Sequence, residues 1–292
     1  MESRKIANYS AALDGLSLEI GVHDLKALAN HSDVLADDSQ VYVNAVAGAG
    51  TDARVKTAEQ LSQLGYRPVA HIAARRMVSA DALDDYLGRL VKRAGVEDVL
   101  VIGGDIAKPL GPFESALDVI ESGVLTTHGI KRIGVAGYPD GHPGVAQSVL
   151  RDALEGKIAA CRIAGIEPYI VTQFSFQAAS IITWCHAFHA RHPTIAVHAG
   201  IPGPAKLATL MRFAKICGVQ SSAKKLLANK KVGLDLLRGT APWEQLDGIG
   251  AYKLETGLAL TTHIFTFGGL EEVTKWLDDV RAGDNGTDVF RI

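Results

Sequence analysis

The chain has 292 residues, of which 47% are hydrophobic and 21% charged, with a formal net charge of −2. This composition can bury a large core, and the near-neutral charge argues against the basic surface typical of nucleic-acid-binding proteins. Three scattered cysteines, no signal-peptide pattern and no long apolar run exclude a disulfide framework and a membrane span, so we expect a cytoplasmic protein.

Eight short runs rich in β-branched residues recur along the chain and predict strands. In chain order they are 16–20, 40–46, 67–73, 98–104, 132–137, 168–173, 194–200 and 260–267. Helical patterns fill most of the gaps, at 52–65, 79–95, 144–165 and 204–218. Ser79 is the expected N-terminal signal of its helix. Glycines stand at the expected C-terminal caps, at Gly65, Gly95, Gly165 and Gly218.

The alternation of strand and helix favours an α/β fold, a single-domain (β/α)8 TIM barrel over residues 1–292. An extra helical segment is expected at about 219–259. A doubly wound sheet is the competing architecture, because counting strands does not prove that the sheet closes.

Polar residues stand at or near the carboxyl ends of the predicted strands, where barrel enzymes gather their active-site groups. They are Glu19, Asn44, His71, Asp105, the segment 138–143, Gln173, His198 and His263. One such residue alone is more often a loop or capping residue, but a set from most strands indicates a site. Glu19 lies in an apolar run, where burial would raise its pKa and suit a general acid. A solvated glutamate at the strand edge is the alternative.

Several motifs resemble the methylenetetrahydrofolate reductase family, over about residues 16 to 280. They are SLEI at 17–20, AHIAA at 70–74, GGDIAKP at 103–109, VAGYPDGHP at 135–143, VTQFSF at 171–176, AGIPGP at 199–204 and HIFTF at 263–267. The resemblance implies a flavoprotein oxidoreductase that binds FAD without a Rossmann fold. FAD would pass hydride from NADH or NADPH to 5,10-methylenetetrahydrofolate, giving 5-methyltetrahydrofolate.

The same resemblance places the chain in one-carbon metabolism and methionine biosynthesis. It implies a cytoplasmic homo-oligomer whose partner is a small-molecule folate. No metal, nucleic acid or membrane is expected to take part.

The resemblance also suggests roles for individual residues. Glu19 looks like the general acid that protonates a folate nitrogen, and Asp105 like a catalytic carboxylate near the flavin and the pterin. Gln173 and Phe213 look like the substrate-binding amide and a ring that stacks on folate and nicotinamide. The positions that match FAD-lining residues are Asn44, His71, Ile102, Gly103, Gly104, Asp105, Tyr138, His142 and Lys157.

Four departures from the family pattern leave alternatives open. The double proline expected after Glu19 is missing, since the chain continues Ile-Gly-Val. Gly103 and Gly269 replace arginines, and Ala45 replaces an aromatic residue. One alternative is the same enzyme run oxidatively in one-carbon catabolism. The other is a non-catalytic folate-binding paralogue or partner subunit.

Other patterns have simpler interpretations. Residues 48–53 match a dinucleotide fingerprint, but the next strand ends without the acidic residue that holds a ribose. His186, His189 and His192 are interpreted as a solvated helix face rather than a metal site. A basic patch of four lysines is also expected to be solvated, formed by Lys224, Lys225, Lys230 and Lys231. Of Phe174 and Phe176, we expect one to face the core and the other a pocket.

Overall fold

The computed structural model describes residues 2–30, 35–45, 48–219 and 241–282. Within these ranges, eight parallel strands close into a barrel in chain order, with the last strand paired to the first. They are β1 Ser17–Ile20, β2 Gln40–Val43, β3 Arg67–Ala73, β4 Asp98–Ile102, β5 Arg132–Gly137, β6 Glu167–Thr172, β7 Val197–Pro202 and β8 Leu260–Phe265. The predicted TIM barrel is confirmed, and the doubly wound alternative is excluded.

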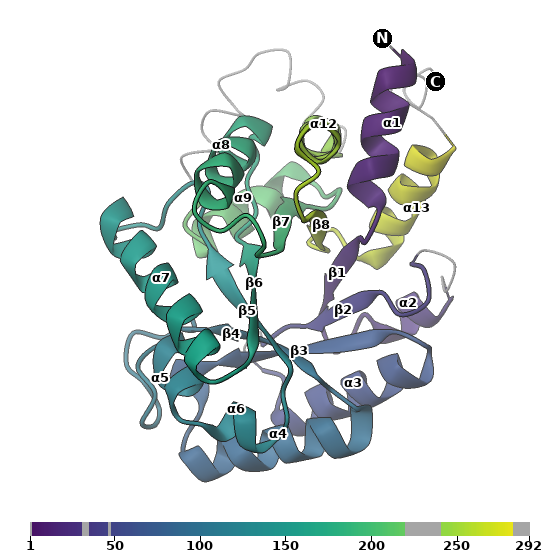
Figure 1. Ribbon diagram of the computed structural model, residues 1–292. Helices are drawn as coiled ribbons and strands as arrows, with labels where there is room; N and C mark the ends of the chain where they lie inside the picture. The colour runs from purple at the N-terminus through teal and green to yellow at the C-terminus, as the bar shows by residue number, and fades with distance from the viewer. Residues whose placement is uncertain (1, 31–34, 46–47, 220–240, 283–292) are drawn as a thin grey trace.

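Helices surround the ring of strands (Figure 1). They are α1 Glu2–Leu13, α2 Leu25–Asn30, α3 Thr51–Gln63, α4 Ala80–Ala94, α5 Ala116–Glu121, α6 Val124–Thr127, α7 Gln147–Ile163, α8 Ala178–His189, α9 Leu207–Ile216, α12 Trp243–Thr256 and α13 Leu270–Arg281. A 3-10 turn, η1 Ala74–Arg76, follows β3. The four predicted helices are confirmed as α3, α4, α7 and α9, with ends that differ by a few residues.

Ser79 caps α4, because its hydroxyl accepts a hydrogen bond from the N–H of Ala82 at 3.0 Å. The helix α12 lies in the predicted extra helical segment at about 219–259, whereas residues 220–240, with the four lysines, lie outside the described residues. The strand β7 starts later than predicted, since Ile195 belongs to a turn in which its N–H donates to the carbonyl of His192.

Two layers of side chains leave each strand in opposite directions. Those of Leu18 and Ile20 pack outward against the helices, in the main hydrophobic core. Those of Tyr42, Leu100 and Tyr169 pack together in a second cluster inside the ring. The strand alternation therefore decides which residues can reach the interior of the barrel.

The amino-terminal end of the ring is closed by charged and amide groups around the buried carboxylate of Asp98. Gln40 donates to Asp98 through its side-chain amide at 2.7 Å. Arg132 and Arg67 approach the same oxygen at 3.4 and 4.0 Å. The charge buried at this end of the barrel is therefore compensated locally.

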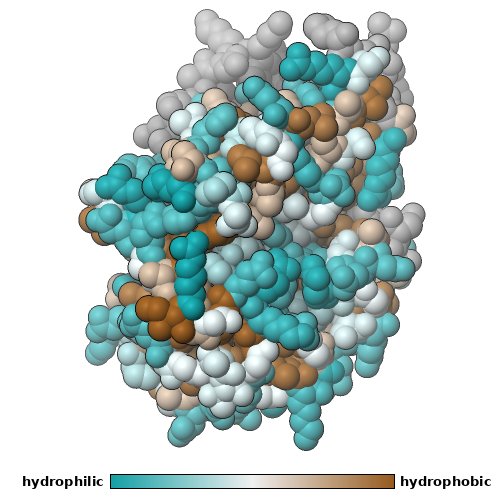
Figure 2. Space-filling view, in the orientation of Figure 1, coloured by the Kyte–Doolittle hydropathy of each residue, from teal (hydrophilic) through white to brown (hydrophobic). Residues whose placement is uncertain are grey.

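The surface seen in Figure 2 is mostly hydrophilic, with apolar side chains gathered at its lower left, in the region of α5, α6 and α7. A shallow groove between these helices is lined in part by Ile120, Ala160 and Ile163, and Ile163 is 88% exposed. No helix in the described part of the chain has both the length and the hydropathy needed to cross a bilayer.

The helices α1 and α12 pack closely through a glycine. A Cβ built on Gly250 of α12 would lie 1.8 Å from the backbone oxygen of Asn8 in α1. The side-chain amide of Asn8 also donates to Asp247 at 2.8 Å, which fixes the same crossing. A residue larger than glycine at position 250 would force the two helices apart.

We therefore predict that Gly250→Ala lowers the free energy of unfolding by about 1–3 kcal/mol, because overpacking outweighs the better helix propensity of alanine. Urea unfolding followed by circular dichroism measures the change. The matched control is Gly156→Ala in α7, where a Cβ would meet no atom within 4 Å. This control should leave the stability unchanged or raise it. Equal stability of the two variants would show that the α1–α12 crossing is not tight.

Candidate functional site

Glu19 is the third residue of β1, and its side chain enters the barrel interior near the carboxyl ends of the strands. The side chain is 14% exposed, and its Oε2 lies 3.5 Å from His71 Nε2 and 3.7 Å from His263 Nε2. Burial raises the pKa of Glu19 above its usual value, and the electrostatic interaction with His71 and a hydrogen bond from Asn44 offset this only in part. The surroundings therefore favour a protonated carboxyl.

The imidazoles beside Glu19 are uncharged. Burial lowers the pKa of His71 and lowers that of His263 to about 3. The Nδ1 of His263 lies 2.9 Å from the hydroxyl of Ser17, which leaves Nε2 toward Glu19. Neither Nε2 has a hydrogen-bond partner within the part of the chain that the structure describes. Glu19 is thus flanked by neutral rings rather than held in a hydrogen-bonded ion pair.

A group of buried aromatic residues packs against these imidazoles inside the barrel. The hydroxyl of Tyr42 lies 3.2 Å from His198 Nδ1 and 3.3 Å from the hydroxyl of Tyr169. The ring of Tyr42 packs edge-on against His263, with centroids 4.5 Å apart. Burial lowers the pKa of His198 to about 3. The pattern of Ser17 with Glu19 and Tyr42 with Asn44, each two residues apart, is the signal that would have placed these side chains inside.

Asp105 follows β4 and lies at the same edge of the barrel, but it has a different environment. Its side chain is 64% exposed, and both of its oxygens accept hydrogen bonds from Arg76 of η1, at 2.7 and 2.9 Å. These bonds are the main reason that the pKa of Asp105 is lowered. Arg76 has no counterpart among the predicted site residues. Asp105 therefore stays a carboxylate, while Glu19 is favoured as the acid.

The backbone before Asp105 leaves open space beside this carboxylate. A Cβ on Gly103 would meet no atom within 4 Å, and Gly104 has a φ of +98°, which side-chain-bearing residues rarely adopt. Ile102 ends β4 and is partly buried. A flat group could approach the chain closely at this point.

Gln173 follows β6, and its side chain is oriented by the backbone next to it. Its Oε1 accepts from the N–H of Phe174 at 3.1 Å, and its own N–H donates to the carbonyl of Gly137 at 2.8 Å. Glu19, Asp105 and Gln173 thus share the carboxyl edge of one barrel, each with its own set of neighbours. Their meeting around one ligand stays a prediction.

An aromatic cluster lies between the ends of β6 and β8 and the helix α9. Phe213 of α9 stacks on Phe267, with centroids 4.1 Å apart and an interplanar angle of 15°. Phe174 and Phe176 are both buried in this cluster, so the expectation that one of them faces a pocket is wrong. Phe213 already has two neighbours over its ring, because it stacks on Phe267 and the guanidinium carbon of Arg212 lies 4.9 Å from its centroid.

The other residues predicted to line a cofactor are distributed over the loop after β5 and α7. Tyr138 and His142 contact each other edge-on, with centroids 5.5 Å apart. Lys157 lies in α7 beside Cys161, and burial lowers the pKa of its amino group. Asn44 and His71 are the two members of the predicted set that contact Glu19 directly.

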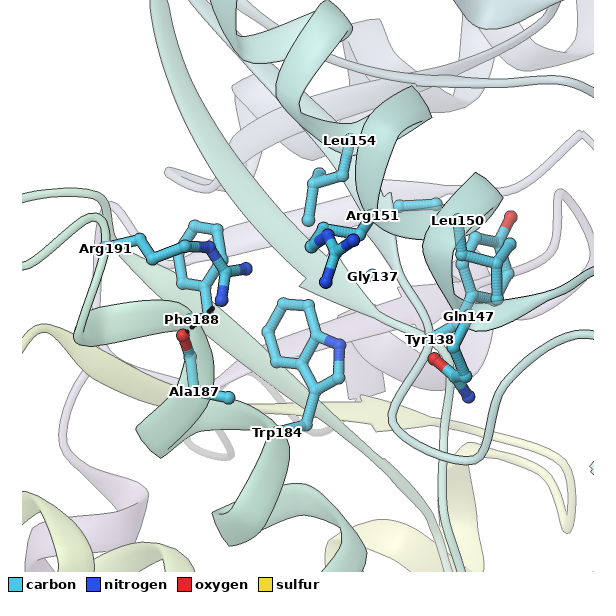
Figure 3. A pocket seen from close by; sticks show the side chains of 11 residues that line it. Gly137, Tyr138, Gln147, Leu150, Arg151, Leu154, Trp184, Ala187, Phe188 and Arg191 are labelled. Atoms are coloured by element: carbon cyan, nitrogen blue, oxygen red, sulfur yellow. Dashed lines mark hydrogen bonds between the residues drawn. The ribbon is translucent and has the colours of Figure 1, made fainter.

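A separate cavity of about 200 Å³ lies outside the ring, between α7 and α8. Figure 3 shows Arg151 of α7 and Trp184 of α8 pointing toward one another across it, with Arg191 to one side. Of the residues predicted for the site, Tyr138 also lines this cavity. The cavity is distinct from the surroundings of Glu19, because it lies outside the ring and neither Glu19, His71 nor His263 lines it.

The loop before α3 and the histidines at 186, 189 and 192 have local partners in the structure. The loop before α3 is held by Arg54, whose guanidinium donates to the carbonyl of Ala49 at 2.7 Å. His189 of α8 is buried and its Nδ1 lies 3.1 Å from the hydroxyl of Tyr252, so a fully solvated histidine face is wrong. His192 instead lies 2.8 Å from the carboxylate of Glu155.

Comparison with known proteins identifies one family and two similar folds. The family model described as methylenetetrahydrofolate reductase matches residues 22–229. An uncharacterized protein from Clostridium thermocellum, which binds two copies of 5-methyl-5,6,7,8-tetrahydrofolic acid, superposes with a TM-score of 0.54 at 12% identity, over 96% of this chain and 98% of that one. A putative deoxyribose-phosphate aldolase from Toxoplasma gondii ME49 gives a TM-score of 0.45 at 10% identity, over 95% and 97%. At 12% identity the first of these structures bears on the fold alone.

The neutral histidines predict a specific loss of stability in acid. The pKa of His198 is about 3 in the folded chain, against about 6.5 when unfolded. Between these values the unfolded chain binds more protons, so stability falls as the pH falls. We expect His198→Asn to reduce the stability lost between pH 7 and pH 5 by about 2 kcal/mol.

Urea unfolding at the two pH values measures this difference. His23→Asn, at an exposed histidine, is the control and should keep the wild-type dependence on pH. If the H198N variant loses as much stability in acid as the wild type, His198 is not held neutral by burial.

Proposed function

The chain belongs to the methylenetetrahydrofolate reductase family, and on that premise we propose that it transfers hydride from NADH or NADPH through FAD to 5,10-methylenetetrahydrofolate. The product would be 5-methyltetrahydrofolate. The observation that carries the proposal is the buried carboxyl of Glu19, surrounded by neutral rings at the carboxyl edge of the barrel. The residues matched by the family model begin at 22, so the role of Glu19 rests on its surroundings and its motif.

Glu19 is suited to supply a proton to the substrate. Burial raises its pKa and so favours the protonated carboxyl, and the group remains 14% exposed, so a ligand at the barrel mouth can reach it. In the proposed step the proton moves from Glu19 to an amine nitrogen of the folate. The bond from that nitrogen to the bridging carbon then breaks, and its electron pair stays on the nitrogen. The lone pair of the second nitrogen on the bridging carbon forms a C=N bond, and the resulting cationic iminium carbon accepts hydride.

Asp105 is suited to the complementary task. Because Arg76 keeps it ionised, its negative charge is available at the barrel edge as the substrate becomes cationic. Gln173 presents an amide whose orientation is set by its bond to the N–H of Phe174. Both groups are proposed to hold the pterin ring.

The residues at the end of β4 fit a flat cofactor. The open space at Gly103 and the positive φ of Gly104 allow a planar ring to approach the backbone. The side chains that would line the cofactor are Asn44, His71, Tyr138 and His142, together with Lys157 of α7. A bound flavin would supply reversible acceptance and donation of hydride. The similar protein from Clostridium thermocellum binds 5-methyltetrahydrofolic acid, which supports a folate as the ligand of this barrel.

Absorption spectroscopy tests the proposed cofactor and reaction together. The protein incubated with FAD should show a bound flavin spectrum that bleaches with NADH or NADPH and returns on addition of methylenetetrahydrofolate. The rate of flavin reduction by methyltetrahydrofolate measures the oxidative direction, for comparison with the rate of methylenetetrahydrofolate reduction. Folate binding without any flavin binding or turnover would instead identify a non-catalytic folate-binding barrel.

The role of Glu19 predicts a split between the two half-reactions. Glu19→Gln should slow flavin reoxidation by methylenetetrahydrofolate by about 10²–10⁴-fold, because the amide has no proton to donate. Flavin reduction by the nicotinamide needs no such proton and should be unchanged. Stopped-flow absorbance measures both rates, and Glu121→Gln, at an exposed glutamate of α5, is the control. Equal losses in both half-reactions of the E19Q variant would contradict the assignment.

A further inference from the structure

The turn after β3 is fastened to the loop that carries Asp105. The backbone N–H of Arg75 donates to the carbonyl of Gly103 at 2.9 Å, and its carbonyl accepts from Leu110 at 2.8 Å. The guanidinium of Arg75 donates to the carbonyls of Glu114, at 2.7 Å, and Ile106, at 3.3 Å. One arginine therefore holds the loop between β4 and α5 at four points.

Close packing makes the same contact rigid. A Cβ on Gly111 would lie 2.4 Å from the backbone oxygen of Met77 and 2.5 Å from that of Val78. The loop therefore rests directly on the backbone that follows η1. These contacts join η1 to the loop after β4. The backbone of Arg76, the next residue of η1, is therefore held in place relative to that loop.

Arg76 extends from this unit to Asp105. Its Nε and Nη2 each donate to one carboxylate oxygen, which is the paired geometry that a guanidinium matches best. The side chain of Arg76 is 22% exposed and that of Asp105 is 64% exposed. An exposed ion pair by itself contributes little to stability. Here the backbone segments that carry Arg76 and Asp105 are already joined by hydrogen bonds, so the two side chains need little further ordering to pair.

We propose that Arg76 is a positioning residue for Asp105, holding its carboxylate in one orientation at the carboxyl edge of the barrel. With one guanidinium engaging both oxygens from one side, the remaining lone pairs face away from η1 and can accept hydrogen bonds from a ligand. Arg76 itself does not touch the reacting atoms. The importance of the pair for the reaction rests on the proposed function, whereas its effect on Asp105 does not.

Carbon-13 NMR of the Asp105 side-chain carboxyl tests the positioning in the ligand-free protein. Asp105→Asn identifies the signal. Arg76→Gln should raise the titration midpoint by about one pH unit or more, because the fork and its charge are removed. Arg76→Lys should give an intermediate midpoint, because the ammonium keeps the charge but not the paired geometry. The control is Arg89→Gln, which breaks an ion pair with Asp52 and Asp85 on the outer helices and should leave the midpoint unchanged.

The outcomes separate this inference from the proposed function. An unshifted midpoint in the R76Q variant overturns the inference, whatever the activity. If R76Q does not fold, a wild-type midpoint in R76K overturns it equally. In active protein, the acid limb of the folate half-reaction should move to higher pH together with the NMR midpoint. A shifted midpoint in protein that never turns over folate supports the positioning by Arg76 and contradicts the proposed function alone.

Discussion

Among the described residues, the basic groups beside Glu19 are neutral imidazoles rather than a lysine or an arginine, and this constraint organises the carboxyl end of the barrel. Transfer of its proton to His71 would create two buried charges 3.5 Å apart, and the cost of desolvating both exceeds their attraction unless further hydrogen bonds support them. Among the residues described, the Nε2 atoms of His71 and His263 have no hydrogen-bond partner, and the support that Glu19 receives is a hydrogen bond from Asn44. Burial accordingly shifts the pKa of the carboxyl upward and those of the rings downward, which is the neutral arrangement on both sides.

The interior beneath Glu19 keeps this neutrality by satisfying its polar groups with one another. Branched aliphatic residues usually fill a barrel of this size. Here Tyr42 lies between His198 and Tyr169, so one hydroxyl serves two neighbours. The charged groups Asp98 and Arg132 are confined to the amino-terminal end. Glu19 is therefore separated from them by uncharged aromatic rings, and its proton depends on local burial rather than on a distant cation.

The sequence predicts those features of the fold and site that follow from periodicity along one strand. The bounds of β3 and β5 agree with the predicted 67–73 and 132–137, because each is an apolar run bounded by turn residues. The strand alternation also brings Glu19, Asn44 and His71 together. It fails for Phe174 and Phe176, because the chain has left β6 and no longer alternates. The Arg76–Asp105 pair joins residues 29 positions apart through the conformation of two loops, which no local pattern encodes. His189 is buried through its contact with Tyr252 of α12, which is likewise a tertiary effect.

Glu19 and Asp105 have environments that shift their pKa values in opposite directions, and this contrast supports their proposed roles. Asp105 cannot readily serve as the acid, because protonation would break its paired bonds to Arg76. Glu19 cannot readily serve as the charged group, because ionisation would leave a carboxylate with one amide and two neutral rings around it. Enzymes that use two carboxyl groups commonly separate the acid from the charged partner by this means. The proposed reaction therefore takes its proton from β1 and its stabilising charge from the loop after β4. For Asp105 to serve as the acid and Glu19 as the charged group, Arg76 would have to pair with Glu19 instead of Asp105.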